Sequence, residues 1–438
     1  MDETLRPVRK HRDRALSVAD AVADRLRDPA ALPSVVPFET PGRASSWEQA
    51  SLAAGYAGIA MLFSNRAHRS DGADRVAAHR YLAGAAHYLR GGRCTRSFGI
   101  FNEVCGLGLS LVLAQQATGG YGKALRSLDA EVASGTERYC DLVGGEPVGP
   151  MGRYDVVDGL SGIARYLLLR NEHPEVLERV LRTLVRLVAP VAHQGATVPG
   201  LWATNPPNRN ERKHPHLQRS GHLNLGLAHG VTGPLALLSI ATAHGVVVEG
   251  QHEAIDSLVG LMDRFQLEDE YGIYWPNFIS LDEWKAGRCT PRRARVSWCY
   301  GAPGVSRALQ LAGRAMGNSA WLRTADASVE AVLALPGDRW SVDHWSLCHG
   351  WSGAMHVLGY FADGPLGERV GQTVDEIADQ LLGGLERTGL PEFWLGEEKF
   401  PPGTEPAGFL EGAAGLALAL DSYAHGPALP WDMALLLR

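Results

Sequence analysis

Hydrophobic residues in this chain gather in runs that follow short glycine motifs. A Gly-x-x-Gly motif at 230–233, for example, leads into the apolar run PLALLSIA. Runs this apolar lack the regular polar positions of a half-exposed helix and are typical of helices buried on all sides. The pattern occurs six times, and a degenerate copy that starts at Glu103 makes a seventh. The copies begin at 55, 103, 159, 230, 301, 350 and 412, and an average spacing just under 60 residues predicts a repeat architecture.

The segments between these runs have a different pattern. In 174–189 the apolar residues fall on one face, and Pro174 stands near the start, which predicts an amphipathic helix. The segment 252–267 is similar. Each repeat therefore combines a helix buried on all sides with a helix buried on one face. Seven such pairs predict an all-α fold, an α/α toroid with inner and outer helix rings; an open solenoid of stacked pairs is the alternative.

The domain organisation follows from the same repeat. We expect residues 1–50 to form a helical lead-in and 51–438 the toroid. Two repeats are longer than the rest, with insertions near 195–222 and 265–298, where YGIYWPNFISL reads as strand. These insertions predict a small accessory element of loops or strands. The glycines are expected to allow positive φ at the loop-to-helix junctions and close helix packing.

Composition excludes several classes of protein. Hydrophobic residues make up 45% of the 438 residues and charged residues 21%, an ordinary globular balance, and the net charge of −6 argues against a nucleic-acid partner. The most apolar stretch, 223–248, contains histidines and a proline and is better explained by a buried helix than by a membrane span. Six cysteines are too few for a disulfide scaffold, and no secretory signal begins the chain. The expected location is a reducing cytoplasm.

The residue before each glycine motif is polar more often than a structural repeat requires. Because the buried helices of a toroid start at one end, these residues are expected to converge on one rim, where helix dipoles favour negative charge and lower a thiol pKa. The seven positions are Ala54, Asn102, Asp158, His229, Tyr300, His349 and Glu411. Asp158 is interpreted as a helix cap.

Two cysteines share one repeat phase. Cys299 in WCYG and Cys348 in LCHG stand at equivalent positions, and His349 follows the second. Three protein ligands with one open position are the usual layout of catalytic zinc, so we predict one Zn²⁺ per chain on these three residues. The alternative is a pair of buried thiols and a capping histidine. The remaining thiols are interpreted as core or surface residues: Cys94, Cys105, Cys140 and Cys289.

Other candidate sites are weaker. The pair His214 and His216 could bind a metal, and the basic run 209–213 could meet an acidic or peptide partner, but a solvated loop explains both. The sequence has no H-E-x-x-H, Walker A or G-x-S-x-G motif.

These motifs together resemble the lanthionine synthetase C family, the lanthipeptide cyclases. The resemblance rests on NLGLAHGVTGPLALLSIA, WCYGAPG, LCHGWSG and YDVVDGLSGIARYLL and covers the chain from about residue 51 to its end. It implies an α/α toroid and a reaction. In that reaction a cysteine thiol of a precursor peptide adds to a dehydroalanine or dehydrobutyrine of the same peptide and closes a lanthionine or methyllanthionine thioether ring.

The resemblance also implies roles for individual residues. Cys299, Cys348 and His349 would bind zinc, and His229 would be the acid/base group. The remaining site residues would be Asp155, Arg295 and Tyr300. Ordinary roles stay open for two of them: Asp155 as a helix cap or salt-bridge partner, and Arg295 as a surface charge.

The implied partners are a dehydrated precursor peptide and a separate dehydratase and exporter, with at most peripheral membrane association. About 50 residues precede the first repeat, too few for a dehydratase domain, so we expect a free-standing cyclase. The accessory element would help to hold the peptide. Three other functions stay open: a glutathione-adding relative acting on dehydroamino acids in proteins, a zinc prenyltransferase-like barrel, and a non-catalytic peptide-binding scaffold.

Overall fold

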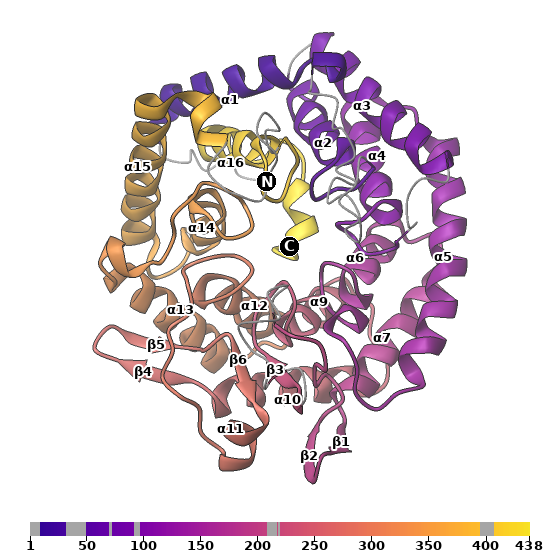
Figure 1. Cartoon of the computed structure of the whole chain (residues 1–438), viewed down its shortest axis with the longest axis vertical. Helices are drawn as coiled ribbons and strands as arrows, with labels where there is room; N and C mark the ends of the chain where they lie inside the picture. Colours follow the sequence, from indigo (N-terminus) through magenta and orange to yellow (C-terminus); the bar gives the residue numbers. More distant parts are fainter. Residues whose placement is uncertain are drawn as a thin grey trace, which may run out of the picture.

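The buried helices form a closed inner ring. In the computed structural model, which describes residues 9–31, 50–69, 72–91, 97–207, 217, 220–394 and 407–438, each of them packs against the next, and the last packs against the first (Figure 1). The predicted α/α toroid is confirmed, and an open solenoid is excluded because the ring closes. The inner helices are α2 (Tyr56–Ala67), α4 (Val104–Thr118), α6 (Leu160–Arg170), α9 (Thr232–Ala243), α12 (Ala302–Ala315), α14 (Trp351–Leu358) and α16 (Ala413–His425).

An outer ring of amphipathic helices surrounds the inner one (Figure 1). Its first member, from the expected lead-in, packs against α16 and so pairs the start of the chain with the last inner helix. The helix predicted over 252–267 ends earlier, at Arg264, because Leu267 begins a strand. The outer helices are α1 (Arg12–Leu26), α3 (Ala73–Arg90), α5 (Gly122–Gly144), α7 (Pro174–Val188), α10 (Gln251–Arg264), α13 (Ser319–Ala334) and α15 (Gly367–Trp394).

Burial in the two rings follows the two sequence patterns. Every residue of α9 from Thr232 to Ala241 is buried. In α7 the buried residues, such as Val180 and Leu184, lie on one side, while Arg182 on the other side is exposed. The apolar stretch 223–248 thus contains a core helix. Among the described residues, no helix has the length and apolarity needed to cross a bilayer.

The glycines serve close packing more than backbone freedom. The expectation of positive φ is wrong for most first glycines of the motif, which are extended, and holds for Gly301, where φ is 94°. The second glycine has a steric role: a Cβ at Gly162, Gly353 or Gly415 would collide with the carbonyl oxygen six residues earlier. Only glycine lets the preceding loop turn back onto the first turn of each inner helix.

Backbone hydrogen bonds join the loops before the inner helices into a closed circuit. At most steps the N–H two residues before a glycine motif donates to the carbonyl at the same position in the next repeat; the third step begins one residue earlier, at Val156. Neighbouring repeats are therefore held in fixed register. The steps are Ala53 to Phe101 (2.9 Å), Phe101 to Val157 (3.5 Å), Val156 to Ala228 (2.9 Å), Ala228 to Cys299 (3.2 Å), Cys299 to Cys348 (3.2 Å), Cys348 to Leu410 (3.0 Å) and Leu410 to Ala53 (2.8 Å).

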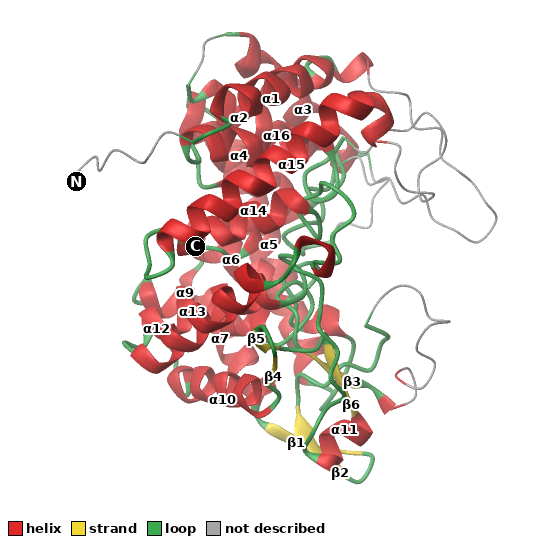
Figure 2. Cartoon of the chain, turned by 90° about the vertical axis from the view of Figure 1, so that its left-hand side faces the viewer, coloured by secondary structure: helices red, strands yellow, loops and turns green. Residues whose placement is uncertain are grey.

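Short antiparallel strands lie in and next to the two segments predicted as insertions, at one edge of the toroid (Figure 1). The strand reading of YGIYWPNFISL is confirmed, with a break at WPN. The loops that precede the inner helices lie on one face of the molecule (Figure 2). The strand pairs are β1 (Pro190–His193) with β2 (Ala196–Pro199), β3 (His222–Asn224) with β6 (Phe278–Ser280), and β4 (Leu267–Asp269) with β5 (Gly272–Tyr274); β6 leads into α11 (Leu281–Ala286).

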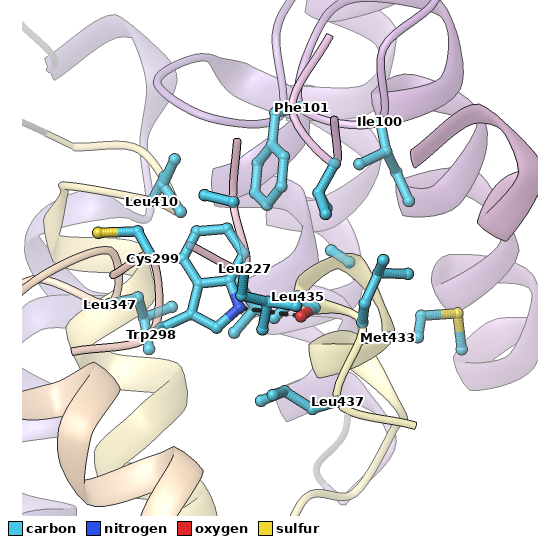
Figure 3. Packing of buried hydrophobic residues seen from close by; sticks show 14 of the residues in the cluster. Ile100, Phe101, Leu227, Trp298, Cys299, Leu347, Leu410, Met433, Leu435 and Leu437 are labelled. Atoms are coloured by element: carbon cyan, nitrogen blue, oxygen red, sulfur yellow. Dashed lines mark hydrogen bonds between the residues drawn. The ribbon is translucent and has the colours of Figure 1, made fainter. Parts of the chain in front are cut away.

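The last residues of the chain fill the centre of the ring. The short 3-10 helix η6 (Trp431–Leu435) is fully buried, as are Leu436 and Leu437. Trp298, next to Cys299, packs against this segment, and its Nε1 donates a hydrogen bond to the Leu435 carbonyl at 2.9 Å (Figure 3). The axis of the toroid is therefore a packed core and no open pore.

Replacing Trp298 with alanine is expected to lower the free energy of unfolding by about 3–5 kcal/mol, because it leaves a cavity at the axis and an unpaired carbonyl at Leu435. Chemical denaturation followed by circular dichroism measures this. The control is Leu142→Ala, at a side chain that is 74% exposed, which should change stability by less than about 0.5 kcal/mol. If both variants lowered the free energy of unfolding by the same amount, packing of Trp298 at the axis would not be a main source of stability.

Candidate active site

Three side chains that could ligate a metal ion meet at the loop face. The Sγ atoms of Cys299 and Cys348 and a ring nitrogen of His349 all lie within 4.8 Å of one another. The backbone circuit brings them together, since the Cys299 N–H donates to the Cys348 carbonyl and so aligns the two repeats. Cys299 is buried, whereas Cys348 and His349 are half-buried. The cluster is thus fixed from the core side and reachable from the loop face.

The two thiols perturb each other. Through their mutual hydrogen bond the pKa of Cys299 is well below the usual value, and the pKa of Cys348 is well above it. Two thiolates side by side repel each other, so one of the pair keeps its proton unless a cation compensates the charge. Soft thiolates with one imidazole are a donor set that suits zinc, for which tetrahedral bonds of about 2.0–2.3 Å are usual. The residues therefore fit a zinc ion.

Two further residues adjoin the cluster and escaped sequence reasoning. The Ser297 hydroxyl lies 3.6 Å from Cys299 Sγ and donates to the Tyr300 carbonyl at 2.6 Å. The His344 ring meets the His349 ring edge-on, with centroids 4.3 Å apart. Both stand within five positions of Cys299 or His349, but no motif marked them; only the folded loops bring them beside these side chains.

A hydrogen-bonded histidine–aspartate pair lies on the same rim. His229 Nδ1 is 2.6 Å from Asp155 Oδ2, and the Asp155 side chain is 2% exposed while that of His229 is 32% exposed. The second oxygen, Asp155 Oδ1, accepts from the N–H groups of Asp158 and Gly159 at 2.8 Å each. Asp155 therefore orients His229 and also holds the loop before α6.

Burial and charge act in opposite directions on this pair. Burial by itself lowers the pKa of His229, but the hydrogen bond and negative charge of Asp155 outweigh it and raise that pKa above the ordinary histidine value. Burial raises the pKa of Asp155, and the contact with His229 opposes that rise. His229 in this pair therefore stays protonated up to a higher pH than a free imidazole does.

We expect Asp155→Asn to lower the pKa of His229, because burial then acts without the compensating charge. The fraction of protonated His229 should fall at a lower pH than in the wild type. Titration of ¹³C-labelled histidines by NMR, with the His229 signal assigned from a His229→Gln spectrum, measures the shift. Asp158→Asn, a more distant charge, should shift the pKa less; an unchanged His229 pKa in Asp155→Asn would contradict the electrostatic role.

Tyr300 is held by a buried amide. Asn224 on β3 is fully buried, and its Nδ2 donates to Tyr300 Oη at 2.9 Å, while its Oδ1 accepts from the Gly226 N–H at 3.0 Å. Tyr300 Oη in turn donates to the Pro207 carbonyl at 3.2 Å. Asn224 thus connects the loop of His229 to the tyrosine beside Cys299. Sequence reasoning did not predict this contact, because an asparagine in a short strand has no distinctive pattern around it.

Arg295 lies close enough to Cys348 for its positive charge to oppose part of the rise in the pKa of that thiol, which the contact with Cys299 causes. It is half-buried, and its guanidinium makes no hydrogen bond or ion pair with any residue of the described ranges. Its backbone carbonyl packs on Gly301, where a Cβ would collide with it. The tight 295–301 loop thus places the Arg295 guanidinium, which has no partner among the described residues, near the cysteine pair.

The rim divides into two halves. Going around the circuit, His229, Tyr300 and His349 are consecutive, and the other half carries Glu411, Ala54, Asn102 and Asp158. The interpretation of Asp158 as a helix cap is wrong: α6 has no side-chain cap, and Asp158 Oδ1 instead accepts from Asn102 Nδ2 at 2.9 Å. The candidate metal ligands, Tyr300 and His229 therefore come from three consecutive repeats of the rim.

The other candidates stay apart from this site. The thiols of Cys105 and Cys140 are buried and that of Cys289 is half-buried, and all three are free. Cys94, His214, His216 and the basic run 209–213 lie outside the described residues. Among the described residues, the Cys299, Cys348 and His349 cluster is the one group that could hold a metal ion.

Comparisons with known proteins agree with the fold and the motifs. A family model described as "Lanthionine synthetase C-like protein" matches residues 46–436. The chain belongs to the lanthionine synthetase C-like family. The sequence is 26% identical to "Nisin biosynthesis protein NisC" of Lactococcus lactis subsp. lactis over 343 residues, which is 77% of each chain. The solved structure of "Nisin cyclase" superposes with a TM-score of 0.75 at 22% identity over 96% of both chains. The resemblance to this family that the motifs indicated is confirmed.

Proposed function

We propose that this lanthionine synthetase C-like protein is a zinc-dependent lanthipeptide cyclase. Its substrate is a dehydrated precursor peptide, and its product carries lanthionine or methyllanthionine rings. One observation carries the proposal: the candidate Cys₂His ligand set and His229 follow one another around the same rim, and Asp155 of the preceding repeat holds His229 by a hydrogen bond. Thiol activation and proton delivery are the two requirements for adding a thiol to a dehydroamino acid.

Cys299, Cys348 and His349 would hold the zinc ion, which leaves one of the usual four positions for a substrate thiol. Bound there, zinc supplies one kind of chemistry: it lowers the pKa of a thiol so that a thiolate exists at neutral pH. The His344 ring and the Ser297 hydroxyl keep the ligand side chains in place.

His229 is proposed to deliver the proton. When the sulfur adds to the β-carbon of the dehydro-residue, the α-carbon needs a proton, and a neighbouring imidazolium is a suitable donor. Asp155 raises the pKa of His229 and so maintains that proton near neutral pH. The overall addition balances, since the proton lost by the thiol equals the proton gained at the α-carbon.

Arg295 and Tyr300 complete the proposed site. Negative charge develops on the carbonyl oxygen of the dehydro-residue during the addition, and a fixed cation stabilises such charge. Arg295 is near Cys348 and has no competing partner among the described residues. Tyr300, held by Asn224, is proposed to orient the peptide beside the ligands.

The partners follow from this reaction. A separate dehydratase has to supply the dehydro-residues, and an exporter is expected to take the modified peptide. We propose a cytoplasmic location with at most peripheral membrane association, and peptide contacts on the strands of the insertions. The name of the relative, "Nisin biosynthesis protein NisC", supports a peptide substrate of this class.

The test uses a synthetic peptide that contains one dehydroalanine or dehydrobutyrine and one cysteine, incubated with the zinc-loaded protein. Cyclisation leaves the peptide mass unchanged and removes the thiol, so the product resists alkylation and gives a ring-specific fragmentation pattern. Glutathione is added in a parallel reaction. Glutathione adducts without rings would establish the glutathione-adding function instead; a mass gain from an added isoprenoid would indicate a prenyltransferase, and an unchanged thiol a peptide-binding scaffold.

A further inference from the structure

A cavity opens beside the loop that carries Cys348 and His349. Its volume is about 590 Å³, and its walls come from the loop before α14, from the first residue of α14 and from the outer helix α15. Asp338, Asp343, Trp351 and Gln380 are among the residues that line it. The proposed thiol addition uses none of these four side chains.

Short contacts connect the cavity wall to the candidate metal ligands. The Trp351 N–H donates to the His344 carbonyl at 2.9 Å, and the His344 ring packs edge-on against the His349 ring, with centroids 4.3 Å apart. Asp343 precedes His344, and its Oδ1 lies 3.8 Å from His344 Nε2. Trp351 follows His349 by two positions. The cavity therefore adjoins the candidate metal site.

The indole of Trp351 is held rigidly in the cavity wall. It is half-buried, and the buried indole of Trp340 stacks on it, with centroids 5.6 Å apart and 26° between the rings. Trp340 is fixed in turn, because its carbonyl accepts from the Val296 N–H at 3.0 Å and its Nε1 donates to the Leu335 carbonyl at 3.2 Å. Trp351 thus gives the cavity a fixed aromatic surface, and such a surface attracts cations.

The charge of the cavity is negative. Asp338 and Asp343 are both exposed, and the described lining contains no lysine or arginine to compensate them. Within the described ranges, Asp338 has no ion pair, and the approach of His344 at 3.8 Å is the one contact of Asp343 with a basic group. A lysine or arginine side chain matches this environment, because its apolar stem packs on an indole and its charged end pairs with carboxylates.

We propose that this cavity binds a lysine or arginine side chain of the precursor peptide, close to the cysteine that reacts. Asp338 and Asp343 pair with the charged end, and Trp351 packs against the stem. The bound cation positions the peptide beside Cys348 and His349, so a thiol with a basic neighbour is preferred. The identity of the peptide rests on the proposed cyclase function, whereas the preference for a cation can be measured by binding alone.

The test uses peptides that share one cysteine and one dehydroalanine and carry lysine, methionine or glutamate at one position, moved stepwise away from the cysteine. Fluorescently labelled versions with alanine in place of dehydroalanine cannot cyclise, and fluorescence anisotropy gives their affinity for the zinc-loaded full chain. At one position or more, lysine should bind about three- to tenfold more tightly than methionine, the usual effect of an exposed ion pair with a cation–π contact, and glutamate should bind most weakly. Added salt should reduce the difference. In cyclisation the preference should appear in KM more than in kcat.

Variants of the two exposed carboxylates test the cavity without disturbing the core. Asp338→Asn and Asp343→Asn should each reduce the lysine preference, and the double variant should abolish it. Asp338→Lys combined with Asp343→Asn should reverse it in favour of glutamate. Trp351→Leu should weaken lysine binding at unchanged zinc content. The matched control is Asp363→Asn, which removes an exposed carboxylate beyond the other end of α14 and should keep the wild-type preference.

Three results would overturn the inference: equal binding of lysine and glutamate peptides by the wild type, a lysine preference that persists in the double asparagine variant, or tightest binding of the methionine peptide, which would assign the cavity to an apolar side chain. Failure of the proposed function looks different. In that case no peptide forms a ring, while the lysine preference in binding persists and still depends on Asp338 and Asp343.

Discussion

Replacing Cys348 with alanine will remove the zinc ion and abolish ring formation. Two of the three ligand atoms that lie within 4.8 Å of each other would remain, and a pair of ligands holds zinc poorly. We expect the metal content to fall from about one zinc per chain to near zero, measured by inductively coupled plasma mass spectrometry on protein purified without added metal. Cys299→Ala should give the same result, since its thiol is the equivalent ligand from the neighbouring repeat.

The matched control is Cys289→Ala, which removes a half-buried thiol outside the cluster and should keep full zinc content and cyclisation. Circular dichroism and the unfolding midpoint show whether the ligand variants keep the toroid. A wild-type protein that contains no zinc when freshly purified, or a Cys348→Ala variant that retains it, would refute the metal site and the proposed function with it.

Replacing His229 with alanine will leave zinc bound and slow ring formation by about 10²- to 10⁴-fold, the usual contribution of a positioned acid/base group. The expected loss lies in the protonation step, because the thiol can still be activated while the α-carbon lacks its donor. The measurement is the rate of loss of free thiol in the dehydrated peptide, combined with zinc analysis of the same sample.

The pH dependence separates a chemical role of His229 from a structural one. If imidazolium is the donor, activity falls as pH rises through the raised pKa of His229, and in Asp155→Asn the fall moves to lower pH because that pKa drops. A variant in another part of the rim, such as Asn102→Ala, should keep the wild-type pH profile. Full cyclisation activity in His229→Ala would remove this residue from the mechanism.

The backbone circuit gives the site its geometry. Cys299 and Cys348 are 49 positions apart, yet one hydrogen bond of 3.2 Å joins their backbones because both stand two residues before a glycine motif. The same register puts His229 one repeat before Tyr300 and two before His349. A site built in this way depends on ring closure, which α1 and the buried chain end around Leu435 reinforce.

Periodicity was enough to predict the two helix rings. The burial of α9 on all sides and of α7 on one side follows from their hydrophobic patterns, since helix packing is decided by which faces are apolar. The pairing of the short strands and the end of α10 at Arg264 did not follow from the pattern, because a few residues carry little periodic signal. The role of the glycines was only partly predicted. The sequence does not show whether a position needs glycine because its φ is positive or because a carbonyl oxygen leaves no room for a Cβ.

By itself, the sequence determined the repeat, the kinds of helix and the phase that Cys299 and Cys348 share, because these depend on residue type and spacing along the chain. Only the tertiary structure decided that Asp155, and not Asp158, binds the loop before α6 and His229, and that Asn224 holds Tyr300. It also decided that Asp338, Trp351 and Gln380 line one cavity. Such contacts join residues far apart in the sequence, and their hydrogen bonds depend on atomic positions that appear only when the ring closes.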